Sequence, residues 1–224
     1  MKWDLFFLMY KLDKNLIAFP DPAHYHPPDG LLAFGGDLSA ERIRLAYENG
    51  IFPWYNPGEE ILWWCPDPRF VLYPHELRIS KSMKKILRDE VFTFTENHCF
   101  RKVLENCMRI ERPGQEGTWL NEELIETFTQ LDHEGLAKSV EVWQKGELVG
   151  GFYGIQIGNV FCGESMFSHV SNASKAGFIH FVNKYRDTLE LIDCQIHSEH
   201  LESLGARMIP KSQYLNILKR NNEF

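Results

Sequence analysis

Two carboxylates stand in otherwise apolar runs in the last third of the chain. Glu164 lies in Phe161-Cys162-Gly163-Glu164-Ser165-Met166-Phe167, and Asp193 lies in Leu191-Ile192-Asp193-Cys194-Gln195-Ile196. Both runs have the composition of buried strands. An unpaired ionised group in a buried strand costs several kcal/mol or is neutralised by a pKa shift. Each carboxylate therefore needs either a buried partner or a chemical role.

Asp193 is followed two residues later by a second polar side chain, Gln195. Side chains at i and i+2 of a strand share a face, so we expect these two to line one surface, with Ile192, Cys194 and Ile196 in the core. An α-amino group has a pKa of about 8, so such a pair could hold an ammonium group and draw off its proton. The alternative is that Asp193 is a structural carboxylate satisfied by nearby backbone.

The elements that must position these residues follow a clear order. Residues 139–144, 148–157 and 160–167 alternate or run apolar and are separated by two-residue turns, which predicts three consecutive antiparallel strands. A helix is predicted from about residue 172, a buried strand over 189–197 and a short helix over 211–219. This is the order of the acyltransferase (N-acetyltransferase-like) fold. We therefore expect an α+β catalytic domain over residues 71–224, with a mixed, largely antiparallel sheet.

The first third of the chain differs in character. Prolines, glycines and tryptophans crowd into runs such as His26-Pro27-Pro28-Asp29-Gly30 and Trp63-Trp64-Cys65-Pro66-Asp67-Pro68. These runs predict short elements joined by tight turns, with one helix over 41–49 that Ser39 caps and Gly50 ends. We expect a small, turn-rich N-terminal domain over residues 1–70.

The segment 79–88 carries the clearest basic cluster. At helical spacing Ile79, Met83, Ile86 and Leu87 face inward, while Lys81, Lys84, Lys85 and Arg88 face solvent. The net charge of the chain is −7, so nucleic-acid contact would have to come from a local patch like this one. An ordinary solvated helix face has the same pattern. After this helix come a predicted strand over 91–95 and helices over 100–109 and 121–135, the last capped by Thr118.

Composition limits the class of protein. The 224 residues are 44% hydrophobic and 25% charged, enough for one ordinary core and a smaller companion domain. The five cysteines are odd in number and scattered, which fits a reducing cytoplasm. The apolar run in residues 1–10 is too short to span a bilayer and no cleavage site follows, so we expect neither an export signal nor a membrane anchor. No coiled-coil repeat or large exposed apolar face is evident, and we expect a monomer.

Nine histidines raise the question of a metal site, and His197 and His200 have usable spacing. No set of cysteines, histidines and carboxylates approaches a zinc signature, and His24, His26 and His75 fall in predicted loops. The glycines between residues 151 and 163 do not form a phosphate-binding fingerprint. We expect no bound metal and no dinucleotide site.

Several long runs, in the same order, closely resemble the leucyl/phenylalanyl-tRNA–protein transferase family. The resemblance extends from Ala18 to Asn216. It is carried by Gly35-Gly36-Asp37-Leu38-Ser39, Gly50-Ile51-Phe52-Pro53-Trp54, Trp63-Trp64-Cys65-Pro66-Asp67-Pro68-Arg69, Glu116-Gly117-Thr118-Trp119, Phe161-Cys162-Gly163-Glu164-Ser165-Met166-Phe167-Ser168, Asn172-Ala173-Ser174-Lys175 and Leu191-Ile192-Asp193-Cys194-Gln195.

The resemblance implies an aminoacyltransferase. Its donors would be leucyl-tRNA and phenylalanyl-tRNA, and its acceptors proteins that begin with arginine or lysine, which are thereby marked for degradation by the N-end rule pathway. An aminoacyl ester is already activated, so its aminolysis needs positioning and charge stabilisation but no cofactor. The resemblance places Glu164 in the same cleft as Asp193, the expected base, with Gln195 orienting. Glu164 would also favour a cationic acceptor side chain, unless it is the buried partner of a salt bridge.

The resemblance also implies an apolar pocket for the donor side chain. Its walls would be Phe152, Gly163, Met166, Phe178, Phe181 and Ile192, residues that by themselves indicate plain core. The chain departs from the family pattern at two of them, because a methionine often stands at Phe152 and an aliphatic residue at Phe178. Larger side chains shrink a pocket, so we expect a preference for leucine over phenylalanine.

Two tryptophans and the basic helix are the expected tRNA contacts. Trp54 and Trp119 could stack on the terminal adenine, or could pack between the domains. Lys81, Lys84, Lys85 and Arg88 could then hold acceptor-stem phosphates without reading sequence.

Two other functional classes share some of these features. An acetyl-CoA N-acetyltransferase would need a glycine-rich pyrophosphate turn at residues 169–174, where this chain reads His169-Val170-Ser171-Asn172-Ala173-Ser174. A noncatalytic module that binds tRNA or protein N-termini would have no need of Asp193 and Gln195. Product formation distinguishes that module from an enzyme.

Overall fold

Two β-sheets organise the protein, which is described here from a computed structural model that places residues 10–25, 27, 29–56, 58–110 and 120–222. The smaller sheet has the strand order β1-β2-β4-β3 and is built from the first third of the chain. Its strands are β1 (Tyr10–Leu12), β2 (Leu31–Gly35), β3 (Phe52–Pro53) and β4 (Leu62–Trp64). The apolar run at 1–9, Thr118 and Trp119 lie outside the described residues. The expected cap was wrong, because Asn121 caps the helix over 122–133 by accepting from the N–H of Leu124.

The larger sheet has seven strands in the order β11-β5-β10-β9-β8-β7-β6. These are β5 (Arg69–Leu72), β6 (Thr93–Glu96), β7 (Ala137–Gln144), β8 (Glu147–Ile157), β9 (Val160–Ser168), β10 (Leu191–Gln195) and β11 (Arg207–Ile209). β9 and β10 pair in parallel, and every other neighbouring pair of this sheet is antiparallel. The predicted α+β class, the three-stranded meander and the mixed, largely antiparallel sheet are confirmed.

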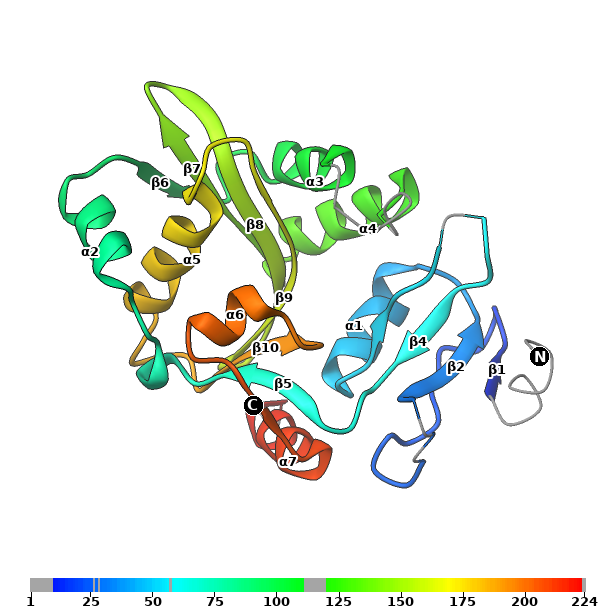
Figure 1. The fold of residues 1–224 in the computed structure, drawn as a ribbon. Helices are drawn as coiled ribbons and strands as arrows, with labels where there is room; N and C mark the ends of the chain where they lie inside the picture. Colours follow the sequence, from blue (N-terminus) through cyan, green and yellow to red (C-terminus); the bar gives the residue numbers. More distant parts are fainter. Residues whose placement is uncertain (1–9, 26, 28, 57, 111–119, 223–224) are drawn as a thin grey trace.

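Helices cover both faces of the large sheet (Figure 1). One apolar cluster joins a sheet face to α2 (Lys81–Arg88) and α5 (Ala173–Lys184). The other cluster joins the opposite face to four helices. These are α1 (Ala40–Glu48), α3 (Phe100–Arg109), α4 (Glu122–His133) and α7 (Lys211–Asn222), and the short helices η2 (Pro74–Glu76) and α6 (Glu199–Ser203) complete the fold.

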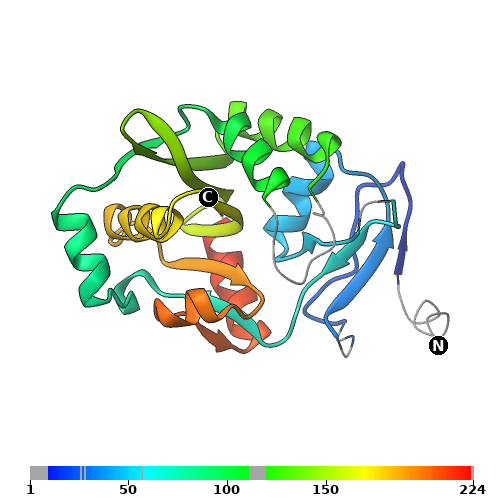
Figure 2. The same cartoon turned by 45° about the horizontal axis from the view of Figure 1, so that its top comes forward.

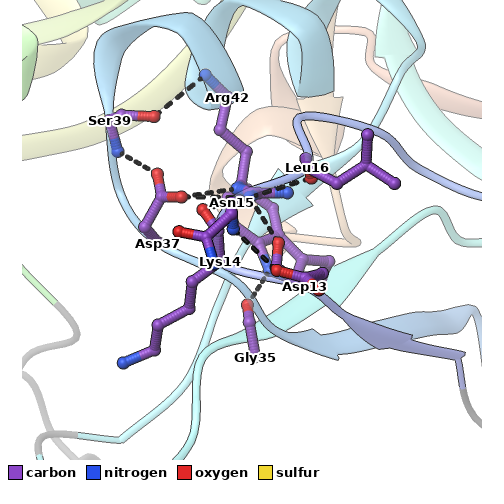
Figure 3. Close-up of polar contacts among 9 residues, drawn as sticks. Asp13, Lys14, Asn15, Leu16, Gly35, Asp37, Ser39 and Arg42 are labelled. Carbon is purple, nitrogen blue, oxygen red and sulfur yellow. Dashed lines mark hydrogen bonds and ion pairs between the residues drawn. The ribbon is translucent and has the colours of Figure 1, made fainter.

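Arg42 connects the segment 13–16 to α1 by hydrogen bonds. Its buried side chain donates to Asp37 and to the backbone carbonyls of Asp13 and Leu16, at 2.8 and 3.2 Å for the carbonyls (Figure 3). Gly36 has φ +78°, and a Cβ there would lie 3.1 Å from the guanidinium, so this position requires glycine. Ser39 caps α1 as predicted. The helix is thereby fixed against the small sheet, and its far end carries Tyr47 towards the large one.

The two sheets share one apolar cluster, which contains Trp63 of the small sheet and Tyr153 of the large one. Residues 65–68 alone separate β4 from β5, so the chain passes directly from one sheet to the other. We propose that the expected domains, residues 1–70 and 71–224, are two units that fold against this common core.

Candidate functional site

A pocket opens where β9 and β10 part. Their parallel pairing ends at Cys162 and Asp193. Immediately beyond, β9 skips Glu164 in its pairing with β8, and β10 skips Cys194 in its pairing with β5. Bulges of this kind redirect side chains and end strand pairing, and they are common beside active sites. Two adjacent bulges therefore place the polar residues of both strands around one opening.

The pocket has a volume of about 340 Å³. It gathers most of the residues that were predicted from separate parts of the sequence. Those that line it are Trp54, Phe152, Gly163, Glu164, Met166, Phe178, Ile192, Asp193 and Gln195. Phe181 does not, because it is buried behind Phe152 with the two ring centroids 5.5 Å apart. Phe181 therefore supports the wall from behind, and its place in the donor pocket stays a prediction.

Asp193 is fully buried, and each of its carboxylate oxygens accepts two hydrogen bonds. Oδ1 accepts from Nε of Arg69 at 2.7 Å and from the backbone N–H of Gln195 at 2.9 Å. Oδ2 accepts from Nη2 of Arg69 at 2.6 Å and from the Tyr214 hydroxyl at 2.9 Å. Asp193 borders the pocket, but its side chain is 0% exposed. The carboxylate is therefore enclosed by these four donors.

The expected alternation along β10 fails after Asp193. Gln195 has φ +63°, in the left-handed region, because the bulge turns the backbone there. Its side chain points to Glu164, with Nε2 2.6 Å from Oε1, rather than sharing the buried surface of Asp193. Ile192 and Cys194 are buried as predicted, but Ile196 is 42% exposed. Placing Ile196 in the core was wrong, whereas Asp193 and Gln195 both border the one pocket.

Glu164 is partly buried at the pocket wall. Burial raises its pKa to about 7, while the nearby Tyr47 hydroxyl and the Gln195 amide act to lower it. The charge of Asp193 raises the pKa further and that of Arg69 opposes it. A carboxyl group with this pKa exchanges its proton near neutral pH, which suits general acid–base chemistry.

Arg69 is the residue that sequence reasoning missed. Its guanidinium is 1% exposed and lies between the rings of Phe52 and Tyr214, at 4.8 and 4.6 Å from their centroids. Burial acts to lower its pKa, but the carboxylate of Asp193 raises it overall. The sequence did contain a signal for this ion pair. Arg69 begins the apolar run Arg69-Phe70-Val71-Leu72, and a cation in a buried strand requires a buried anion, just as Asp193 requires a buried cation.

The short helix α6 was also missed, and it closes one side of the pocket. Ser198, His200 and Leu201 line the wall there. Burial and the charge of Lys175 lower the pKa of His200. His197 contacts Glu202 instead. In the described ranges of the chain, no three histidines, cysteines or acidic residues lie close enough to hold a metal ion.

Trp54 reaches the pocket while the basic helix lies elsewhere. Trp54 is 37% exposed, and its ring is held by Trp64 at a centroid distance of 5.7 Å. Helix α2 exposes Lys81, Lys84, Lys85 and Arg88, as predicted, and packs through Met83. Figures 1 and 2 both place α2 at the opposite side of the molecule from the small sheet. No helix of the described part has the length and apolarity needed to cross a membrane.

Comparison with known proteins assigns both parts of the chain to one family. A family described as "Leucyl/phenylalanyl-tRNA protein transferase" matches residues 71–219, and its N-terminal domain matches residues 36–67. Curated relatives carry the same name. One from Flavobacterium johnsoniae is 54% identical over 212 residues, covering 94% of this chain and 99% of the relative.

Further relatives cover similar shares. One from Azotobacter vinelandii is 49% identical, with 92% of both chains covered. One from Escherichia fergusonii is 47% identical, with 95% of this chain and 90% of the relative covered. A solved structure titled as a GCN5-related N-acetyltransferase-like protein from Streptococcus suis is 16% identical with a TM-score of 0.37, over 75% of this chain and 62% of that one.

Proposed function

Because the chain belongs to the leucyl/phenylalanyl-tRNA–protein transferase family and is an aminoacyltransferase that uses tRNA donors, we propose that it joins leucine or phenylalanine to proteins beginning with arginine or lysine. The acceptors are thereby marked for degradation by the N-end rule pathway. The observation that supports the reaction chemistry is the pairing of Glu164 with Gln195 at the wall of an apolar pocket.

Glu164 is the proposed proton acceptor. An incoming α-ammonium group has a pKa of about 8 and must lose its proton before it can attack. Glu164 has a pKa of about 7 and lines the pocket, whereas the carboxylate of Asp193 is enclosed by Arg69 and Tyr214. The amide of Gln195 holds Glu164 through its N–H, and its carbonyl oxygen can accept from the amine. Asp193 then acts by holding Gln195 in place.

Protons balance across the steps of the reaction. Glu164 takes one proton from the α-ammonium group, and the neutral amine attacks the ester carbonyl and forms the new carbon–nitrogen bond. The bond from that carbonyl carbon to the ribose oxygen of the tRNA then breaks, and the ribose oxygen leaves as a hydroxyl group with the proton from Glu164. The nitrogen, which still carries one proton too many, gives it to the ionised Glu164, and Glu164 releases it to solvent, so each transfer frees one proton. The ester supplies the driving force, so what the protein contributes is orientation and proton transfer.

The acceptor preference follows from charge. A carboxylate at the amine-binding wall attracts an arginine or lysine side chain as well as the α-ammonium group. Glu164 is such a carboxylate, and the net charge of −7 has the sign that attracts cationic N-termini.

The donor side chain occupies the apolar part of the pocket, between Phe152, Met166, Phe178 and Ile192 with Gly163 at its edge. Phe152 packs edge-on against Phe178, with the two ring centroids 5.8 Å apart. Together the two rings reduce the space in the pocket. Met166 can adjust to either guest. We propose that leucine is accepted better than phenylalanine, because both aromatic rings occupy space the larger guest needs.

Trp54, at the pocket mouth, is placed to stack on the terminal adenine, and Trp119 is proposed for the same end of the tRNA. Lys81, Lys84, Lys85 and Arg88 are proposed to bind backbone phosphates. Helix α2 packs on α5 at the far side from the small sheet (Figure 2). A tRNA that binds both Trp54 and α2 extends from the pocket towards that side. We place the enzyme in the cytoplasm as a monomer, where its five free cysteines remain reduced.

The test supplies the purified protein with leucyl-tRNA, phenylalanyl-tRNA or acetyl-CoA and a peptide beginning with arginine. Matched peptides begin with lysine or alanine, or carry an acetylated terminus. A leucine-sized mass gain on the arginine and lysine peptides, with little on the other two, is the expected result. An acetyl gain, or equal labelling of the alanine peptide, would contradict the proposal.

A further inference from the structure

Arg69 is a buried charge that the proposed chemistry does not use. It lies in β5 and is not among the residues that line the pocket. We propose that Arg69 is a positioning residue for aminoacyl transfer: through Asp193 it holds the backbone turn that presents the amide of Gln195 to Glu164. The inference rests on the proposed role of Glu164.

The contact between Arg69 and the turn runs through a single oxygen atom. Oδ1 of Asp193 accepts from Nε of Arg69 and from the backbone N–H of Gln195. Arg69 and the turn therefore depend on the same carboxylate orientation. The neighbouring residue Phe70 pairs with Gln195 across the sheet, so β5 supports the turn from its backbone as well.

The conformation held in this way is strained. Gln195 is not glycine, yet its φ is +63°, and the left-handed conformation is unfavourable for a residue with a Cβ atom. The hydrogen bond to Asp193 offsets that strain. If the carboxylate rotates or leaves, the residue can return to the extended region, and its amide then moves away from Glu164.

The geometry favours arginine over lysine at this position. The planar guanidinium makes two hydrogen bonds to one carboxylate while stacking between Phe52 of β3 and Tyr214 of α7. Lysine can supply the positive charge, but it cannot make two parallel hydrogen bonds to one carboxylate or stack a planar group on the rings. Phe52 also lines the pocket, so Arg69 joins the small sheet, β10 and α7 directly behind the site.

Stability alone is a weak reason for this arrangement. Buried ion pairs are often no more stabilising than apolar residues of the same volume. In addition, Nη1 of Arg69 is buried and has no hydrogen-bond partner among the residues that the structure describes. A group retained despite that penalty is better explained by what it positions.

The test compares Arg69→Lys with Arg207→Lys. Arg207 on β11 also donates two hydrogen bonds to one carboxylate, that of Glu76, at 2.9 and 3.1 Å, and its guanidinium lies over the ring of Tyr73. Unlike Arg69, it is on the surface, away from the pocket. Each variant is assayed for melting temperature, kcat, KM for leucyl-tRNA and the pH dependence of kcat.

We expect Arg69→Lys to lower kcat by about 10- to 100-fold, as misplacement of a catalytic group does, with KM unchanged. The acidic limb of the pH profile should move to higher pH, because the Gln195 amide favours ionised Glu164. The other groups that act on Glu164 are Tyr47 on α1, Asp193 on β10, Cys162 on β9 and the position-69 cation itself, and the lysine keeps that charge. Arg207→Lys should match the wild type.

Tyr214→Phe provides a second variant if Arg69→Lys does not fold, since it removes one donor to Asp193 and keeps the ring over Arg69. It should lower kcat and shift the limb in the same direction, to a smaller extent. A folded variant with wild-type kcat and an unmoved limb would overturn the inference, as would an equal loss in Arg207→Lys. If the wild-type profile itself lacks an acidic limb near pH 7, the proposed role of Glu164 fails instead.

Discussion

The side-chain amide of Gln195 donates a hydrogen bond of 2.6 Å to the carboxylate of Glu164, across the opening between β9 and β10. Each residue sits at or beside a bulge in its own strand. The parallel pairing of the two strands has already ended at Asp193 and Cys162. The two polar groups therefore meet beyond the point where the backbone pairing of the two strands ends, and both line the pocket there.

Replacing Glu164 by glutamine should abolish most of the transfer activity. The change keeps the shape and the contact with Gln195 but removes the proton acceptor, so we expect kcat to fall by about 10²- to 10⁴-fold. In the wild type, kcat should rise with pH through about 7, as Glu164 ionises. The pH profile of the variant should lack that limb. Retention of the limb in Glu164→Gln would assign it to another group.

The same carboxyl group makes stability depend on pH. Its folded-state pKa of about 7 lies above the ordinary value of 4.5, so the folded protein binds the proton more tightly than the unfolded chain does. Stability from this group is fully present below about pH 4.5 and is lost as pH rises through 7. We expect the wild type to lose stability relative to Glu164→Gln over this window. Urea unfolding of both proteins at several pH values measures the difference, and a constant difference would contradict it.

Removing one member of the buried ion pair should differ from removing both. Asp193→Ala leaves Arg69 uncompensated in the core and should cost about 3–5 kcal/mol of unfolding free energy. The double variant Arg69→Met/Asp193→Leu should recover most of that stability, because apolar residues of similar size can replace a buried pair. It should not recover activity, since nothing then holds the turn at Gln195. Wild-type kcat in the double variant would contradict this account.

Enlarging the donor pocket should change which amino acid is transferred. Phe152→Met removes a ring that reduces the space in the pocket. We expect kcat/KM for phenylalanyl-tRNA to rise by about tenfold relative to that for leucyl-tRNA. Phe181→Leu is the matched control, because Phe181 is equally buried but does not line the pocket. It should lower the melting temperature without changing the ratio. A wild type that already prefers phenylalanine would contradict the proposed leucine preference.

Charge reversal on α2 should weaken tRNA binding. Lys84→Glu should raise the Kd for leucyl-tRNA, and the quadruple change of Lys81, Lys84, Lys85 and Arg88 should flatten the dependence of log Kd on salt. Lys219→Glu is the control, since Lys219 is also an exposed lysine on a helix but belongs to α7. Equal effects of Lys84→Glu and Lys219→Glu would show that only net charge matters.

Local sequence was sufficient for the elements that local forces decide. The strand meander follows from alternation and two-residue turns, α1 from its Ser39 cap, and α2 from an apolar stripe, and each is found where it was predicted. The family resemblance was likewise present in short runs of neighbouring residues, and the relatives confirm it. Short β5 and α6 were missed because four- and five-residue elements carry too few residues to show a period.

Tertiary structure alone decided what the two polar residues of β10 do. The regular alternation of a strand predicts that Asp193 and Gln195 act as a pair, but beyond the bulge after Asp193 the side chain of Gln195 binds Glu164 instead. The bulge lies in the pairing of β10 with β5, which is far earlier in the chain, and the guanidinium of Arg69 in β5 binds the carboxylate beside it. Contacts between residues 124 positions apart leave no mark in the spacing of either segment, so the sequence identified the residues while the fold assigned their partners.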